Sequence, residues 1–181
     1  DLAILGGGPA GVAAGVYSAR KKLKTIFITK DFESQSVVSP DIQNWIGNIS
    51  ISGADLAKNF RNHLLAYSQD CLELQEGHWI KSVTKTNEGF SIETDKSTFS
   101  AKTILISTGS SRRKLEITGA DKFEHKGITY CASCDGPVFS GQDVAVIGGG
   151  NAAFEAAAQL LAYCKSVTLF NRTEKYRADE I

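Results

Sequence analysis

Methionine is missing from the 181-residue sequence, which lacks even an initiator residue. The sequence also opens directly on an apolar run at residues 2–5 that has the composition of a buried strand. We therefore expect this chain to be part of a longer protein.

An excess of charge of either sign is missing too, because 20 basic residues balance 20 acidic ones. No basic run exceeds Ala-Arg-Lys-Lys at residues 19–22, so the chain lacks the positive patch of a nucleic-acid or membrane-surface binder. No apolar stretch approaches the ~20 residues of a membrane span, and the start lacks the regions of a signal peptide. These absences predict a cytoplasmic protein with neither nucleic acid nor membrane as a partner.

Metal-ligating side chains are few, with four cysteines and three histidines. A structural zinc site needs about four ligands at suitable spacing, and only Cys131 and Cys134 are closely spaced, while Cys71 and Cys164 stand alone. We expect no metal. A close Cys-x-x-Cys pair in a reducing compartment then points to redox chemistry.

The same pattern occurs near both ends of the chain: an apolar run, a glycine-rich turn, a segment of helical composition and a second apolar run. The first copy covers residues 2–29 and the second residues 143–170. Each copy predicts a β-α-β unit, so the fold class is α/β with two Rossmann-like dinucleotide-binding domains. We place the domain boundary near Arg112, in a polar, irregular stretch.

Between the two copies the sequence predicts further elements of the first domain. Leu56, Phe60 and Leu64 have helical spacing within residues 53–68. Residues 71–99 alternate like a small antiparallel meander, and residues 102–109 read as a buried strand that returns to the first domain.

Each glycine-rich turn fits a known phosphate-binding pattern. In G-x-G-x-x-G one glycine makes the tight turn, the next admits the pyrophosphate close to the backbone, and the third lets helix pack on strand. The N–H groups at the helix start then face the phosphates. Gly6, Gly8 and Gly11 occupy these positions in the first turn, and Gly148, Gly150 and Ala153 in the second.

The residue after each second strand indicates which dinucleotide is bound, since an acid there accepts ribose hydroxyls and a base accommodates a 2′-phosphate. Asp31 is the acid nearest the first strand end. The second strand ends at Asn171, and Arg172 and Arg177 follow, which favours NADPH over NADH. Two arginines on a solvated loop are the alternative interpretation.

The motifs GGGPAG, QNWIG, ISTGS, YCASCDG, VIGGGNAAFEAA and NRTEKYRAD occur in the order found in low-molecular-weight thioredoxin reductases, which this chain resembles over essentially its whole length. The resemblance implies an FAD-binding domain at residues 1–112 and an NADPH-binding domain at 113–181, both incomplete because the chain stops early. It also implies a redox-active disulfide at Cys131 and Cys134, a thioredoxin-like protein substrate and a homodimer of the full-length protein.

The resemblance assigns two sets of cofactor-binding residues. The FAD set comprises Gly6, Gly7, Gly8, Pro9, Ala10, Gly11, Asp31, Gln35, Asn44, Thr108 and Gly109, and the NADPH set Gly148, Gly149, Gly150, Asn151, Ala152, Ala153, Arg172 and Arg177. The chain departs from the family at Glu33-Ser34-Gln35, where Gly-Gly-Gln is usual, and at Asn171-Arg172-Thr173, which retains one of two arginines.

The expected reaction moves electrons from NADPH through FAD to the disulfide and then to an acceptor disulfide. Asp135 is the expected proton donor or acceptor, because no histidine is near in sequence; helix capping is its alternative role. Two other functions stay open: the flavoprotein subunit of alkyl hydroperoxide reductase, whose redox segment usually reads Cys-Pro-His-Cys, and a non-catalytic redox or nucleotide-sensing module.

Overall fold

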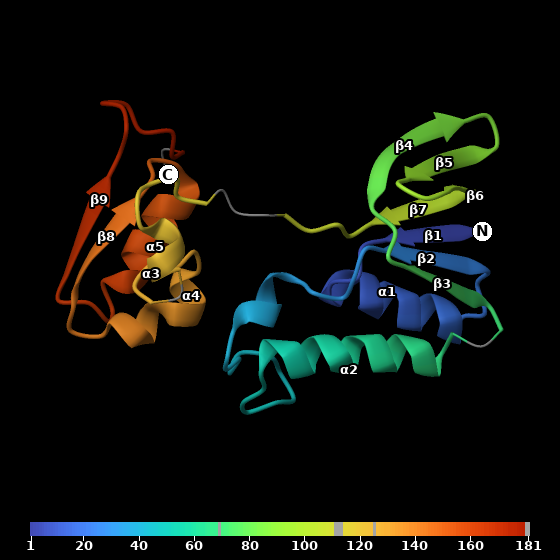
Figure 1. The fold of residues 1–181 in the computed structure, drawn as a ribbon, viewed down its shortest axis with the longest axis horizontal. Coiled ribbons are helices and arrows are strands. Elements are labelled where there is room, and N and C mark those ends of the chain that lie inside the picture. Colours follow the sequence, from blue (N-terminus) through green and yellow to red (C-terminus); the bar gives the residue numbers. More distant parts are fainter. Residues whose placement is uncertain (69, 111–113, 125, 180–181) are drawn as a thin grey trace. The chain divides into compact units, whose positions relative to one another are not determined.

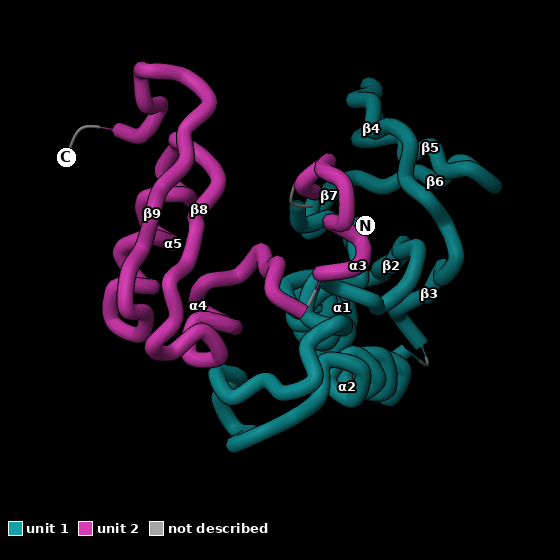
Figure 2. The backbone as a smooth tube through the Cα atoms, turned by 60° about the vertical axis from the view of Figure 1, so that its left-hand side comes forward, with its two compact units in different colours: residues 1–111 teal, residues 112–181 magenta. Residues whose placement is uncertain are grey.

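The computed structural model describes residues 1–68, 70–110, 114–124 and 126–179. It divides into two compact units, residues 1–111 and 112–181, which Figure 2 shows in different colours. The predicted boundary at Arg112 lies outside the described residues, and the division falls next to it.

The first unit is built on a parallel four-stranded sheet with the order β3-β2-β1-β7 (Figure 1). Its strands are β1 (Leu2–Leu5), β2 (Thr25–Thr29), β3 (Leu72–Glu76) and β7 (Thr103–Ile106). Because parallel strands all point the same way, the segments that follow β1, β2 and β7 gather at one edge of the sheet. The predicted parallel α/β fold is confirmed.

Two helices cover one face of this sheet, α1 (Pro9–Arg20) and α2 (Gly53–Ala66) (Figure 1). Helix α1 starts with a proline in its first turn, which costs no hydrogen bond there. The hydroxyl oxygen of Ser52 caps α2 by accepting a hydrogen bond from the N–H of Asp55. The buried core between helices and sheet consists of Ile4, Val12, Val16, Ala19, Phe27, Phe32, Leu56, Phe60, Leu64 and Leu72.

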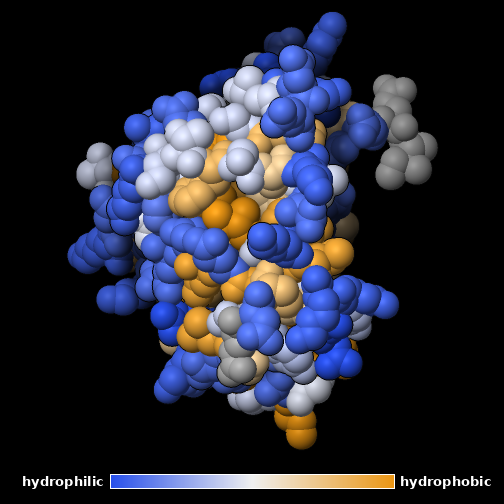
Figure 3. Space-filling model, turned by 90° about the vertical axis from the view of Figure 1, so that its right-hand side faces the viewer, coloured by the Kyte–Doolittle hydropathy of each residue, from blue (hydrophilic) through white to orange (hydrophobic). Residues whose placement is uncertain are grey.

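The other face of the sheet packs against a three-stranded antiparallel sheet, β4 (Ile80–Thr86), β5 (Gly89–Thr94) and β6 (Thr98–Ala101). Ala3, Leu5 and Ile28 meet Ile92 in this second core. Alternation along β1 and β2 thus supplies apolar side chains to both faces. Figure 3 shows one side of the molecule, on which apolar side chains gather near the centre of a largely hydrophilic surface.

One expectation for this unit was right in part and one was wrong. The predicted antiparallel meander is present in β4, β5 and β6, with its first turn at residues 87–88. It does not begin at Cys71, because β3 pairs in parallel with β2 and Leu72 packs into the helix-side core. The returning strand β7 is not buried: it lies at the edge of the sheet, where Leu105 and Ile106 are 36% and 63% exposed. Apolar composition alone did not distinguish an edge strand from a central one.

The second unit contains the second β-α-β copy. Strands β8 (Asp143–Ile147) and β9 (Ser166–Phe170) pair in parallel and are connected by α5 (Asn151–Leu160). Val146, Ala153 and Leu160 form its buried core. The short helices α3 (Ala120–Phe123), α4 (Ala132–Asp135) and η2 (Gly136–Phe139) precede the strands, and η1 (Gln35–Val38) belongs to the first unit.

No helix in the part of the chain that the structure describes is both long and apolar enough to cross a membrane. Nor do three or more His, Cys, Asp or Glu side chains among the described residues form a group able to hold a metal ion.

Candidate functional site

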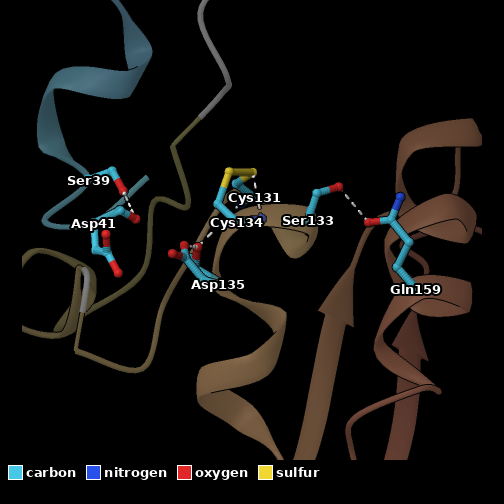
Figure 4. The surroundings of a disulfide bond; sticks show 8 residues. Ser39, Asp41, Cys131, Ser133, Cys134, Asp135 and Gln159 are labelled. Carbon is cyan, nitrogen blue, oxygen red and sulfur yellow. Dashed lines mark hydrogen bonds between the residues drawn. A yellow bond between two sulfur atoms is a disulfide. The ribbon is translucent and has the colours of Figure 1, made fainter. Parts of the chain in front are cut away.

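The cysteine pair forms a disulfide bond at the start of α4 (Figure 4). Cys131 is the N-cap of this short helix, and its sulfur accepts a hydrogen bond from the backbone N–H of Cys134 at 3.2 Å. The other two cysteines, Cys71 and Cys164, are free. The turn therefore holds both sulfurs of the pair in one place and supplies a backbone donor to one of them.

Asp135 ends α4, next to the second cysteine, and its side chain is half-buried. The hydroxyl of Thr129 is hydrogen-bonded to its Oδ2 and accepts a hydrogen bond from the N–H of Cys131 at 3.3 Å. The capping role receives no support: Cys131 caps α4, and Asp135 makes no capping hydrogen bond to η2. The carboxylate is instead tied to the segment of chain that leads into the disulfide.

Thr129 was not among the predicted site residues. The sequence carries no signal for it, because a hydrogen bond between two side chains six residues apart leaves no periodic pattern. The segment has a second anchor in Tyr130, whose hydroxyl oxygen accepts a hydrogen bond from the N–H of Leu115 at 3.0 Å.

A further hydrogen bond joins the disulfide turn to α5. The hydroxyl of Ser133 donates to Oε1 of Gln159 at 2.8 Å, as Figure 4 shows. Helix α5 begins at the second glycine turn. Helix α5 therefore follows the predicted nucleotide-binding turn directly and contacts the disulfide turn near its C-terminal end.

The first glycine turn has the three separate properties that dinucleotide binding requires. Gly6 has a φ of +112°, which favours glycine. A Cβ on Gly11 would lie 1.9 Å from the carbonyl oxygen of Gly6, so helix α1 approaches the turn more closely than any side chain permits. A Cβ on Gly8, by contrast, would meet nothing closer than 4.0 Å. The open side at Gly8 leaves room for a pyrophosphate, and these residues therefore fit FAD.

Several predicted FAD-binding residues lie around this turn. A Cβ on Gly7 would lie 2.4 Å from the carbonyl oxygen of Asp31, and one on Gly6 would lie 3.0 Å from Cα of Thr108. The side-chain amide of Gln35 donates a hydrogen bond to the carbonyl oxygen of Ser110, next to Gly109. All of these residues follow β1, β2 or β7 at the same sheet edge.

Asn44 differs from them: it is exposed in the loop after η1, and no described contact links it to the turn. Ser107 was not among the predicted residues, and its hydroxyl donates a hydrogen bond to the carbonyl oxygen of Leu5 at 2.9 Å. This bond fastens the end of β7 to the end of β1, where the turn begins.

The second glycine turn repeats the arrangement. A Cβ on Gly148 would lie 2.9 Å from Cβ of Ala153, which is buried, so the alanine of the G-x-G-x-x-A variant fits closely beneath the turn. A Cβ on Gly150 would meet nothing within 4 Å. The open position is again the second glycine of the motif, which fits a second dinucleotide.

Residues 171–179 fold back onto this second turn, and we call them the closing segment. A Cβ on Gly149 would lie 2.1 Å from Oδ1 of Asn171, and the N–H of Arg177 donates to the carbonyl oxygen of Gly149 at 2.6 Å. The side chains of Arg172 and Arg177 are exposed, and neither forms a salt bridge within the described residues. Both remain available to an anionic ligand.

Comparison with known proteins shows the family of this chain. The family model for pyridine nucleotide-disulphide oxidoreductases matches residues 1–180. The F subunit of alkyl hydroperoxide reductase in Escherichia coli (strain K12) is 38% identical and NADH dehydrogenase of Bacillus subtilis (strain 168) 35% identical, each over 182 residues. Both alignments cover 100% of this chain and 35% of the relative.

Two solved structures of similar fold are thioredoxin reductases. The enzyme from Giardia duodenalis is 31% identical with a TM-score of 0.87, and the one from Streptococcus pyogenes MGAS5005 is 32% identical with a TM-score of 0.81. Each match covers 98% of this chain and 57% of the solved chain. The chain thus spans little more than half the length of these structures and 35% of the length of the curated relatives.

Proposed function

Because this chain belongs to the pyridine nucleotide-disulphide oxidoreductase family, we propose that the protein is a thioredoxin-disulfide reductase. Electrons would pass from NADPH through FAD to the Cys131–Cys134 disulfide and then to a thioredoxin-like protein. One observation carries this proposal: the disulfide lies at the start of α4, in the same compact unit as the second glycine turn.

FAD would be held at the first glycine turn, by Gly6 to Gly11 with Asp31, Gln35, Thr108 and Gly109, and with Asn44 through the loop after η1. When bound, FAD supplies two-electron transfer between a reduced nicotinamide and a disulfide. The open side at Gly8 supports this assignment.

The nicotinamide dinucleotide would lie at the second glycine turn, on Gly148 to Ala153. We propose NADPH rather than NADH because Arg172 and Arg177 follow the strand end, where an acid would bind ribose hydroxyls. Arginine suits this task because its guanidinium can donate two hydrogen bonds to one phosphate.

The protein's own residues carry out the disulfide exchange. Two electrons break the bond between the sulfurs of Cys131 and Cys134. One resulting thiolate attacks an acceptor disulfide and forms a mixed disulfide, which releases one acceptor sulfur. The second cysteine sulfur then attacks the mixed disulfide, which releases the other acceptor sulfur and restores the Cys131–Cys134 bond. Asp135 would deliver a proton to the departing sulfur, from the position in which Thr129 holds it.

The flavoprotein subunit of alkyl hydroperoxide reductase is the second candidate function, favoured by the 38% identity to the relative of that name along the whole chain. The electron path is the same in both, and the acceptor differs. The Cys-Ala-Ser-Cys segment favours the reductase of thioredoxin. In either case we propose that the full-length protein is a homodimer.

The test is NADPH oxidation by the full-length protein with purified thioredoxin or with the peroxide-reducing component of alkyl hydroperoxide reductase as acceptor. Faster turnover with thioredoxin supports the first candidate, and faster turnover with the peroxide-reducing component supports the second. A variant in which Cys131 and Cys134 are both serine serves as the control. Absence of turnover with either acceptor would contradict both candidates and favour a sensing module.

A further inference from the structure

The closing segment is fastened to the second glycine turn by a reciprocal pair of hydrogen bonds between two exposed residues. Nδ2 of Asn151 donates to Oδ2 of Asp179 at 2.7 Å, and the backbone N–H of Asp179 donates to Oδ1 of Asn151 at 2.8 Å. The amide of Asn151 thus uses one of its two N–H donors and its oxygen on one residue, 28 positions further along the chain.

This pair lies at the start of helix α5. Asn151 is the first residue of the helix, directly after the open glycine, Gly150. The positive end of the helix dipole lies there, which favours the carboxylate of Asp179 nearby. The contact therefore has an electrostatic reason to form in addition to its two hydrogen bonds.

In sequence, Arg177 lies between Asp179 of this pair and Tyr176, which makes a second contact with helix α5. The ring of Tyr176 meets the ring of Phe154, on α5, edge to face at a centroid distance of 5.2 Å. The N–H of Arg177 is bound to the carbonyl oxygen of Gly149, and Asp179 follows two residues later. The backbone of Arg177 is thus held against the glycine turn from both sides, while its guanidinium remains exposed.

We infer that Asp179, through Asn151, is a positioning residue that sets the preference of this site for a dinucleotide with a 2′-phosphate by holding Arg177 beside the turn. The inference rests on the proposed function, since it takes the second turn as the nicotinamide dinucleotide site. A carboxylate next to a phosphate site would by its charge alone weaken phosphate binding. The geometry assigns it the opposite effect, because its hydrogen bonds order the arginine in advance.

The charge of Asp179 and its hydrogen bonds would change NADP⁺ affinity in opposite directions, so the inference can be tested. Titration calorimetry of the full-length protein with NADP⁺ and NAD⁺ measures these affinities and needs no turnover. Asp179→Ala removes the carboxylate and should weaken NADP⁺ binding about tenfold, the size of one charge-assisted hydrogen bond, with NAD⁺ binding unchanged. Asp179→Asn keeps an acceptor oxygen and the backbone N–H, so it should retain the preference of the wild type.

Glu174→Ala is the matched control. It removes one negative charge from the same closing segment at an exposed position, so pure electrostatics predicts equal or tighter NADP⁺ binding for Glu174→Ala and Asp179→Ala alike. The inference predicts that only Asp179→Ala weakens it. In the double variant Asn151→Ala with Asp179→Ala, the loss of NADP⁺ preference should not exceed that of Asp179→Ala, since both residues serve one contact.

Arg177→Ala separates the inference from the proposed function. If Arg177→Ala weakens NADP⁺ binding and Asp179→Ala does not, the positioning role is wrong and the phosphate assignment stands. If Arg177→Ala leaves NADP⁺ and NAD⁺ binding unchanged, the assignment of the phosphate to Arg177 is wrong, and the inference falls with it. The NADPH assignment falls as well only if Arg172→Ala also leaves both affinities unchanged. A rise in NADP⁺ affinity for Asp179→Ala would also overturn the inference.

Discussion

Thr129 and Asp135 are joined by a hydrogen bond between the hydroxyl of the first and the carboxylate of the second, across the disulfide segment. The same hydroxyl accepts a hydrogen bond from the N–H of Cys131. One side chain therefore links the backbone before the disulfide to the acid after it. This gives the carboxylate a defined position beside the disulfide segment before any acceptor arrives.

Replacing Thr129 tests whether this link matters for disulfide exchange. We expect Thr129→Val to slow reduction of the acceptor about five- to tenfold, because the carboxylate loses the hydrogen bond that orients it. Thr129→Ser, which keeps the hydroxyl, should restore most of the rate. Stopped-flow measurement of acceptor reduction, with flavin reduction by NADPH recorded as an internal control, checks this. Equal rates for the valine and serine variants would show that the link plays no part.

The two glycines Gly8 and Gly11 offer a matched pair within one turn. Gly11→Ala should destabilise the protein by about 1–3 kcal/mol or more, because its Cβ would lie 1.9 Å from the carbonyl oxygen of Gly6. Gly8→Ala should cost about 1 kcal/mol or less, since its φ of −75° suits alanine and its Cβ would face open space.

Gly8→Ala should nevertheless purify with much less flavin, because the added methyl group occupies the space that the pyrophosphate needs. Thermal unfolding and the ratio of flavin to protein absorbance measure the two effects separately. Full flavin content in a folded Gly8→Ala variant would be evidence against FAD binding at this turn.

The two cysteines of the disulfide should separate the flavin step from the exchange step. Either Cys131→Ser or Cys134→Ser should abolish acceptor reduction while hydride transfer from NADPH to FAD continues, since that transfer does not use the sulfurs. Cys71→Ser is the control, because this cysteine is free and lies in the other unit. Rapid-mixing spectra of the flavin and a coupled acceptor assay follow the two steps. Acceptor reduction at the wild-type rate in either serine variant would place the reaction elsewhere.

The family resemblance further predicts that Cys134 is the sulfur that contacts the flavin. In Cys131→Ser the remaining thiolate should then perturb the flavin absorbance, and in Cys134→Ser it should not. Reversed spectra would exchange the roles of the two residues.

The loop that carries Asn44 should respond to acid. Hydrogen bonds from Ser50 and then from Gln43 lower the pKa of Asp41 below its usual value. Because the pKa is lower in the folded state, the stabilisation exists above the unfolded pKa of about 3.9 and is lost as pH falls through the folded pKa. The N–H of Ile51 is bound to the carbonyl oxygen of Ile42. The protection factor of this amide, which is its intrinsic exchange rate divided by its observed rate, should therefore fall in acid.

Carboxyl NMR titration checks the cause of this shift. Ser50→Ala should raise the pKa of Asp41 more than Gln43→Ala does, because the bond from Ser50 has the larger effect. The opposite order would show that the loop is held differently in solution.

Features that depend on neighbouring residues could be predicted from the sequence alone. Both β-α-β units follow from apolar runs on either side of glycine turns, because a positive φ at Gly6 and at Gly148 requires glycine locally. These units needed no knowledge of the rest of the chain. The Cys131–Cys134 disulfide was implied by the family resemblance rather than by its spacing, and the structure contains it.

The contacts between distant segments could not be predicted and are seen only in the folded chain. Strand β3 joins the parallel sheet, and β7 lies at its edge, because pairing and core packing chose among strands of similar composition. The link from Thr129 to Asp135 and the pair of Asn151 with Asp179 join polar side chains, whose partners depend on how the backbone places them. Polar contacts of this kind leave no periodic pattern in a sequence, since hydrogen bonds require a particular geometry rather than a particular spacing.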